Sequence, residues 1–284
     1  MRFSSPLRYP GGKASLADLL TQIRRINNLA DSTMAEPFAG GAGASLTLLF
    51  REEAPEILIN DADPAIHDFW WSLVNAPKGF LKKLSVTKIN MTEWRRQRDI
   101  YRAQRASRCS RGFAAFYLNR CNRSGIVMDG GPIGGTHQTG PWKLNARFNR
   151  PDLLLRCQRV AEYRDRVRVS CLDGIDFIKA LRGQSQFLFI DPPYFAKGQT
   201  LYLNSLDETY HRRLSAVLKS MSSESWVLTY DDCPEIRVMY KSWANIRPFS
   251  LRYVASDRRN GREILITPRW LKLPVSQNSR AVMW

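Results

Sequence analysis

Short apolar runs and amphipathic stretches alternate along most of the chain. Continuous apolar runs of a few residues are typical of strands buried on both faces, whereas apolar residues three or four apart are typical of helices. Strands are expected from residue 34 and at 56–61, 167–173, 187–190, 226–230, 247–254 and 263–267, and helices at 16–26, 65–84, 153–160, 175–181, 208–221 and after 232. This alternation predicts an α/β protein with a Rossmann-like sheet.

The last two predicted strands are joined by the basic turn 256–262, whose Asn260-Gly261 pair is typical of a β-hairpin. Residues 124–149 are different, because they are rich in glycine and polar residues and have no helical period. So long a stretch inside a compact domain is usually functional. We expect either a loop or hairpin that probes a groove of a partner, or a flexible surface loop.

The apolar strand 187–190 stops at Asp191-Pro192-Pro193-Tyr194. Ligands of open α/β sheets bind at the carboxyl ends of the strands. Prolines have no N–H, so this turn offers a carboxylate and backbone carbonyls as acceptors with few competing donors. Together with the aromatic ring of Tyr194, it suits the exocyclic amine of a nucleobase. The alternative is an ordinary strand exit with a helix-capping aspartate.

A glycine-rich turn follows the first strand, in residues 36–46, and Asp61 ends the next strand 20 positions after Gly41. That separation places a carboxylate on the ribose hydroxyls in Rossmann-type folds. Leu46 stands where a dinucleotide fingerprint needs a further glycine. A nucleoside cofactor without a pyrophosphate is therefore favoured over NAD, and a turn without ligand is the alternative. The earlier turn 8–13, ending in Lys13, is a weaker candidate anion site.

The formal net charge of +17 over 284 residues predicts an anionic partner, with nucleic acid ahead of a membrane surface. No apolar run is long enough to cross a bilayer and the amino terminus does not resemble a signal peptide, so we expect a cytoplasmic protein. The five scattered cysteines and three histidines favour neither a disulfide framework nor a metal site.

Arginine is concentrated between residues 94 and 123, with few matching acids and with aromatic residues interspersed. Arginine is well suited to contact phosphates and guanine edges. This segment is expected to be helical and to face nucleic acid; a solvated basic helix is the alternative.

Three motifs in order, Pro10-Gly11-Gly12-Lys13, Glu36-Pro37-Phe38 with Gly40-Gly41-Ala42-Gly43, and Asp191-Pro192-Pro193-Tyr194, resemble those of the Dam-type (D12 class) DNA adenine-N6 methyltransferases. The resemblance covers roughly residues 5–268. It implies a Rossmann-like methyltransferase sheet with an inserted, mainly helical target-recognition domain. The catalytic domain would comprise residues 1–75 and 155–270, the insertion 76–154, and a tail 271–284.

The resemblance also implies the site. Catalysis would involve Asp191, Pro192, Pro193 and Tyr194, which would hold a flipped adenine. S-adenosylmethionine would be bound by Tyr9, Lys13, Glu36, Pro37, Phe38, Gly40, Gly41, Gly43, Asp61 and Asp173. Lys13 would lie near the methionine carboxylate, Asp61 on the ribose and Asp173 by the adenine ring, with Asp176 as a competing choice for the last role.

Double-stranded DNA is the expected partner, contacted by Arg95, Arg96, Arg120, Asn122, Arg123, Lys143, Arg258 and Arg259. Residues 116–120 match the family's usual lead-in, but residues 121–125 lack the aromatic and asparagine typical of GATC-specific members. Another recognition sequence is therefore expected. The alternatives are a cytosine-N4 or RNA methyltransferase of the same fold and a non-catalytic DNA-binding module. We further expect a bacterial or phage-encoded, nucleoid-associated monomer or weak dimer without an obligatory protein partner, either orphan or in restriction-modification.

Overall fold

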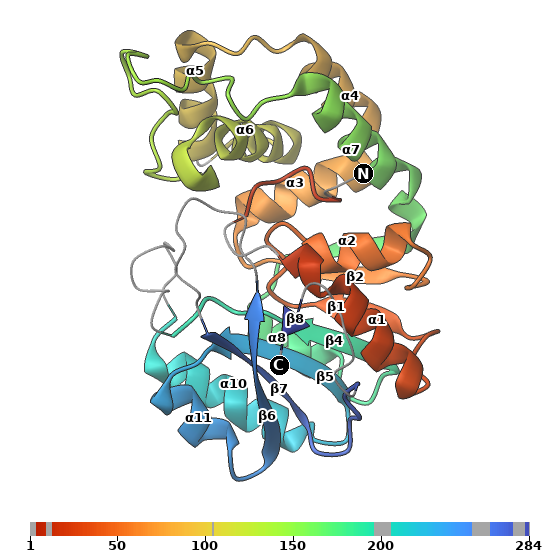
Figure 1. Ribbon diagram of the computed structural model, residues 1–284. Helices are drawn as coiled ribbons and strands as arrows, with labels where there is room; N and C mark the ends of the chain where they lie inside the picture. The colour runs from red at the N-terminus through yellow and green to blue at the C-terminus, as the bar shows by residue number, and fades with distance from the viewer. Residues whose placement is uncertain are drawn as a thin grey trace.

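A computed structural model describes residues 4–9, 13–103, 105–195, 206–251, 262–274 and 282–283 (Figure 1). The strands are β1 (Thr33–Glu36), β2 (Ile57–Asn60), β3 (Val167–Ser170), β4 (Gln186–Ile190), β5 (Ser225–Asp231), β6 (Ala244–Leu251), β7 (Arg262–Pro268) and β8 (Val282–Met283). Within these residues they form one eight-stranded sheet in the order β3-β2-β1-β4-β5-β7-β6-β8. The first five strands of this order run parallel to one another, β7 pairs antiparallel with β5 and β6, and β8 pairs antiparallel with β6.

The parallel strands are buried on both faces. Phe187 and Phe189 of β4 lie in one apolar cluster, and Leu188 and Ile190 lie in another on the opposite face. Successive side chains of a strand point to opposite faces, so each face needs its own cover of helices. The prediction of a doubly buried strand before Asp191 is confirmed.

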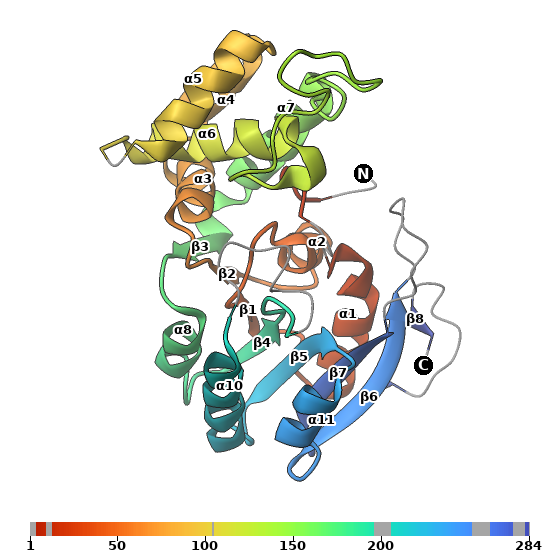
Figure 2. The same ribbon diagram turned by 90° about the vertical axis from the view of Figure 1, so that its left-hand side faces the viewer.

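Helices cover both faces of the sheet. On one side lie the short helix η1 (Lys13–Leu16), α1 (Ala17–Ile26) and α2 (Gly43–Phe50). On the other lie α8 (Gly174–Ala180), α10 (Glu208–Ser220) and α11 (Pro234–Tyr240), as Figure 2 shows. The result is the α/β layering expected from the sequence.

A helical region stands beyond the carboxyl edge of the strands (Figure 1). It consists of α3 (Pro64–Asn75), α4 (Pro77–Val86), α5 (Met91–Arg102), α6 (Arg108–Cys121), η2 (Arg123–Gly125) and α7 (Arg150–Glu162), and η3 (Arg164–Arg166) leads back to the sheet. The single helix expected at 65–84 is wrong. Pro77 starts a new helix, because a proline fits the first turn of a helix and not its interior.

The core of the helical region is an aromatic cluster. Phe69 of α3 stacks on Phe116 of α6 with ring centroids 5.6 Å apart. Phe80 and Phe113 pack edge-on around this pair. The cluster is continuous with the apolar face beneath α1 and α2. The division expected at residues 154/155 lies inside α7, so the two parts share a helix as well as a core.

The predicted carboxyl-terminal hairpin has the expected pairing, with β6 antiparallel to β7. Its turn, including Arg258 and Arg259, lies outside the described residues, and so do residues 10–12 of the turn before Lys13. In the described parts of the chain, no helix has the length and apolarity to span a membrane.

Candidate active site

Acidic side chains gather at one edge of the sheet. Glu36 and Asp231 end β1 and β5, Asp61 and Asp191 directly follow β2 and β4, and Asp173 lies in the loop between β3 and α8. Because these strands are parallel, their carboxyl ends share an edge. The strand order reverses between β1 and β4, which is where open α/β sheets form their binding crevice. Glu36 and Asp191 flank this point.

Asn60 ties together the loops that follow β1, β2 and β3. Its buried amide donates to the carbonyls of Pro37 and Leu172, both at 2.9 Å. Its Oδ1 accepts from the Ser170 hydroxyl at 2.8 Å and from the Leu172 N–H at 2.9 Å. One side chain therefore fixes the ends of β1, β2 and β3 relative to one another.

Asp191 is held from two sides through the same oxygen. The Thr229 hydroxyl on β5 donates to Oδ1 at 2.5 Å, and the Lys13 ammonium lies 3.5 Å from that atom. Burial raises the pKa of the Asp191 carboxyl, and Lys13 and the Thr229 hydrogen bond offset part of the rise. Thr229 was not predicted, because a threonine inside an apolar strand has no distinctive sequence pattern.

Tyr194 also meets Lys13, which donates to the phenol oxygen at 2.5 Å. The Tyr194 ring is tilted against Tyr230 of β5, with centroids 6.3 Å apart. The Phe195 N–H donates to Asp231 at 3.2 Å. These contacts fix the turn that begins at the buried Pro192.

Lys13 is itself buried and has a second acidic neighbour, Glu263 of β7, at 3.2 Å. The family resemblance implied a cofactor carboxylate for Lys13 and no role for Glu263. Among the described residues the acidic contacts of Lys13 are Asp191 and Glu263. The ammonium thus lies at the Asp191 end of the site, and its contact with the cofactor carboxylate stays a prediction.

The glycine turn is shaped around Tyr9. Gly40 has φ +45°, and a Cβ there would stand 2.6 Å from the Tyr9 ring. Only glycine combines this backbone conformation with so close an aromatic neighbour. The indole of Trp70 donates to the Gly40 carbonyl at 2.9 Å, which anchors the turn from α3. Gly41 also lies beside Tyr9, and Gly43 begins α2.

Glu36 is a buried acid and Asp61 a half-buried one, and both have few donors. Glu36 accepts from the Ser45 hydroxyl at 2.5 Å, and burial raises its pKa to about 8. Asp61 accepts from the Gly40 N–H at 2.8 Å and from the Asp63 N–H at 2.9 Å, and burial raises its pKa to about 7. Each carboxylate retains lone pairs for further donors.

The structure separates the two candidates for the adenine-side acid. Asp173 caps α8, accepts from the Tyr210 hydroxyl at 3.0 Å, and precedes Gly174, which lies under the Phe38 ring. Asp176 is exposed and pairs with Lys179 at 3.2 Å. Of the two acids, Asp173 is the one placed beside Phe38.

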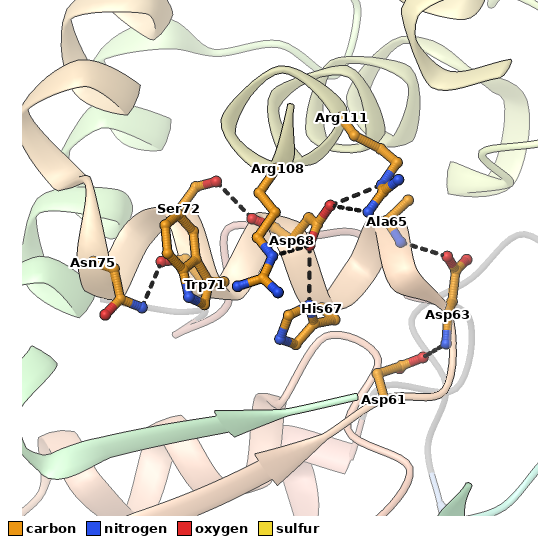
Figure 3. A network of polar contacts seen from close by, with 10 residues as sticks. All are labelled: Asp61, Asp63, Ala65, His67, Asp68, Trp71, Ser72, Asn75, Arg108 and Arg111. Carbon is orange, nitrogen blue, oxygen red and sulfur yellow. Dashed lines mark hydrogen bonds and ion pairs between the residues drawn. The ribbon is translucent and has the colours of Figure 1, made fainter. Parts of the chain in front are cut away.

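Helix α3 links this edge to the helical region (Figure 3). Asp63 begins α3 next to Asp61, and one turn on, Asp68 is 1% exposed and pairs with Arg111 of α6 at 2.6 Å. Arg108 approaches the same carboxylate at 4.0 Å. Charge on α6 is thus partly used to hold α6 onto α3.

The predicted DNA-contacting residues fall into two groups. Arg95, Arg96, Arg123 and Lys143 are exposed. Arg96 pairs with Glu93 at 2.7 Å, and Arg123 and Lys143 each donate to a loop carbonyl. These four present positive charge on the helical region and its loop.

Arg120 and Asn122 are buried. Arg120 donates to the Arg147 carbonyl at 2.9 Å, and burial lowers its pKa to about 10. Asn122 accepts from the Trp94 indole at 2.8 Å and donates to the carbonyls of Ile126 and Val127. The structure therefore places both inside the framework that holds the 124–149 loop, apart from the exposed cations.

The family model of D12 class N6 adenine-specific DNA methyltransferases matches residues 9–255. The chain belongs to this family. No curated protein matches it significantly. This adenine-N6 methyltransferase acts on DNA, so the cytosine-N4, RNA and non-catalytic alternatives are not favoured. The family depends on S-adenosylmethionine, which is the implied methyl donor.

Proposed function

We propose that the Asp191–Tyr194 turn holds an adenine rotated out of duplex DNA and presents its N6 amine for methylation. The observation that carries this proposal is the double engagement of Asp191 Oδ1 by Thr229 and Lys13. With Oδ1 fixed, the carboxylate has one orientation, and its Oδ2 is the natural acceptor for an amine hydrogen. The position of Asp191 at the strand-order reversal supports the same assignment.

We further propose that the Glu36–Gly43 turn, Asp61 and Asp173 bind S-adenosylmethionine. The two acids fit this ligand, because Asp61 has lone pairs for two ribose hydroxyls and the buried Glu36 forms no ion pair with any cation of the described residues. The cofactor carries an ammonium and a sulfonium that match a negative site. When bound, it supplies an electrophilic methyl group on a positively charged sulfur.

The chain's own task is to make a poor nucleophile reactive. The lone pair of an aromatic amine is delocalised into its ring. Hydrogen bonds from the two amine hydrogens to Asp191 and to the Pro192 carbonyl favour the pyramidal form and leave the lone pair exposed. The prolines contribute no N–H that would compete for these acceptors.

Extraction of the base from the duplex costs a few kcal/mol. Stacking on Tyr194 offsets part of this cost. Lys13 holds the phenol of Tyr194 at 2.5 Å, so the ring is restrained before the base arrives. A restrained platform loses less entropy on binding than a mobile one.

We assign recognition of duplex DNA to the helical region and its 124–149 loop. The exposed Arg95, Arg96, Arg123 and Lys143 are the proposed backbone contacts. The net charge of +17 supports association with a polyanion. Arg120 and Asn122 contribute indirectly, by shaping the loop.

The test uses long duplex DNA amplified in vitro, which carries no methylated bases, with purified enzyme and S-adenosylmethionine. Mass spectrometry of the nucleosides should detect N6-methyladenine, and single-molecule sequencing should assign it to one sequence motif. Asp191→Ala should abolish transfer while cofactor affinity, measured by calorimetry, stays near that of the wild type. Normal methylation by this variant would refute the proposed role of Asp191.

A further inference from the structure

Glu263 is a fully buried acid next to the methyl-transfer turn. It lies on β7, which pairs with β5, and is 0% exposed. Its Oε2 lies 3.2 Å from the Lys13 ammonium and its Oε1 lies 3.5 Å away. Burial of an ionised carboxylate costs free energy of desolvation unless ion pairs or hydrogen bonds compensate its charge.

The distances around Lys13 are unequal. The ammonium is 2.5 Å from the Tyr194 hydroxyl, 3.2 Å from Glu263 and 3.5 Å from Asp191. Charge-assisted hydrogen bonds between an ammonium and a carboxylate are usually about 2.7–2.9 Å long. Both carboxylates are farther from Lys13 than this, and Glu263 is the nearer of the two, so Lys13 forms no tight pair with Asp191.

We propose that Glu263 is a positioning residue for methyl transfer, which holds Lys13 close enough to orient Asp191 but too far away to form a tight ion pair with it. The inference rests on the proposed role of Asp191 as acceptor of the amine hydrogens. A tight pair would pull the carboxylate toward Lys13 and weaken it as an acceptor. Glu263 competes for the ammonium and so keeps Asp191 available.

The charge on Glu263 has a second effect on Asp191. Among the described residues, the ionisable groups that interact with Asp191 are Lys13 of η1, Glu36 of β1 and Glu263 of β7, while Tyr194 contacts Lys13 and Asp231 of β5 contacts Phe195. Glu263 raises the pKa of Asp191 and Lys13 lowers it. Loss of Glu263 and loss of Lys13 should therefore shift the ionisation of Asp191 in opposite directions.

The experiment measures single-turnover methyl transfer to amplified, unmethylated duplex DNA as a function of pH. Transfer requires ionised Asp191, so the rate falls on the acid side as Asp191 is protonated. For Glu263→Gln we expect the acid limb to move to lower pH by roughly one unit, and the plateau rate to fall about 10- to 100-fold. For Lys13→Met the limb should move to higher pH.

A variant that merely damaged the fold would lower the rate without these opposed shifts. Glu263→Asp retains the charge, so its acid limb should stay at the wild-type pH even where its plateau rate falls. Thr267→Val changes another buried side chain of β7 and should leave both the limb and the rate unchanged. Cofactor affinity should be unaffected in the Glu263 variants.

An acid limb for Glu263→Gln that stays in place, or moves to higher pH, overturns the inference. The inference is also overturned if the acid limb of Glu263→Asp shifts in the same way as that of Glu263→Gln. Asp191→Ala separates this failure from that of the proposed function. If Asp191→Ala is inactive and the Glu263→Gln limb is unshifted, only the role of Glu263 is lost; an active Asp191→Ala removes the basis of both.

Discussion

Arg111 of α6 and Asp68 of α3 form an ion pair within the helical region, with Nη2 2.6 Å from Oδ2, in which Asp68 is buried and Arg111 is half-buried. Removal of one partner from a buried pair leaves an uncompensated charge, which costs about 3–5 kcal/mol. Arg108, 4.0 Å from Asp68, remains when Arg111 is removed and offsets part of this cost.

We therefore expect Arg111→Ala to lower the free energy of unfolding by about 2–4 kcal/mol. Arg51→Ala is the matched control, since Arg51 pairs with Asp18 on the surface, and it should cost less than about 1 kcal/mol. Urea denaturation of both variants measures the difference. Equal losses would mean that the Asp68 pair contributes no more than a surface contact.

The two groups of basic and polar residues should respond differently to substitution. Alanine at Arg95, Arg123 or Lys143 should weaken binding to duplex DNA, and the slope of log affinity against log salt should become shallower by about one for each phosphate that the variant no longer neutralises. Arg120→Ala should lower the unfolding temperature, because a buried guanidinium that holds the Arg147 carbonyl is removed. Fluorescence anisotropy across a salt series, paired with thermal denaturation, distinguishes the two effects. An unchanged salt slope for all three surface variants would exclude them as phosphate contacts.

Thr229→Val removes the hydroxyl that holds Asp191 Oδ1 and keeps the side-chain shape. A hydrogen bond to a charged group contributes about 1.5–3 kcal/mol, so single-turnover transfer should slow about 10- to 150-fold. This hydrogen bond lowers the pKa of Asp191 in the wild type, so its removal should also move the acid limb of the rate to higher pH. Thr229→Ser restores the donor and should recover most of the rate; a Val variant with normal kinetics would contradict this role.

Cofactor affinity should rise with pH. Glu36 has a pKa of about 8 in the free protein, so near neutral pH it is mostly protonated. A cationic ligand binds the ionised form better, and affinity should therefore increase up to about tenfold per pH unit between roughly pH 6 and 8. Calorimetry should detect proton release on binding. Glu36→Gln should flatten the dependence that belongs to Glu36, leaving the contribution of Asp61, whose pKa is about 7.

The same groups make the cofactor-free protein less stable as pH rises. Glu36 and Asp61 hold their protons more tightly when folded than when unfolded, so the folded state binds more protons between the two sets of pKa values. Stability then falls from about pH 5 toward pH 8. Thermal unfolding across this range should record the fall, and Glu36→Gln should reduce it. A stability that rises over this interval would contradict the buried state of these acids.

The acids at the carboxyl edge of the sheet could be predicted from the sequence, because the patterns that indicate them are local. The apolar strand before Asp191 and the separation of Gly41 and Asp61 each lie within a short segment. Thr229 and Glu263 reach the site only through the pairing of β4 with β5 and of β5 with β7, which no local pattern specifies. The register of these long-range strand pairings determines that Thr229 and Glu263 lie at the site.

Arg120 illustrates an error of a different kind. Its residue type alone favours contact with DNA, but it follows Phe113, Phe116 and Tyr117 at helical spacing and shares their buried face. The break at Pro77 was likewise present in the sequence. At Arg120 the helical period carried more information than residue type, whereas at position 77 the proline itself carried more information than the helical period.

The aromatic cluster of Phe69, Phe80, Phe113 and Phe116 bears on attempts to change target specificity. A graft of residues 76–154 from a relative would import two of the helices that meet on α3 and leave α3 itself behind. In the stacked pair, Phe69 would then come from one parent and the residue at position 116 from the other. A working chimera needs α3 to be transferred with the graft, so the unit of exchange is larger than the insertion expected at residues 76–154.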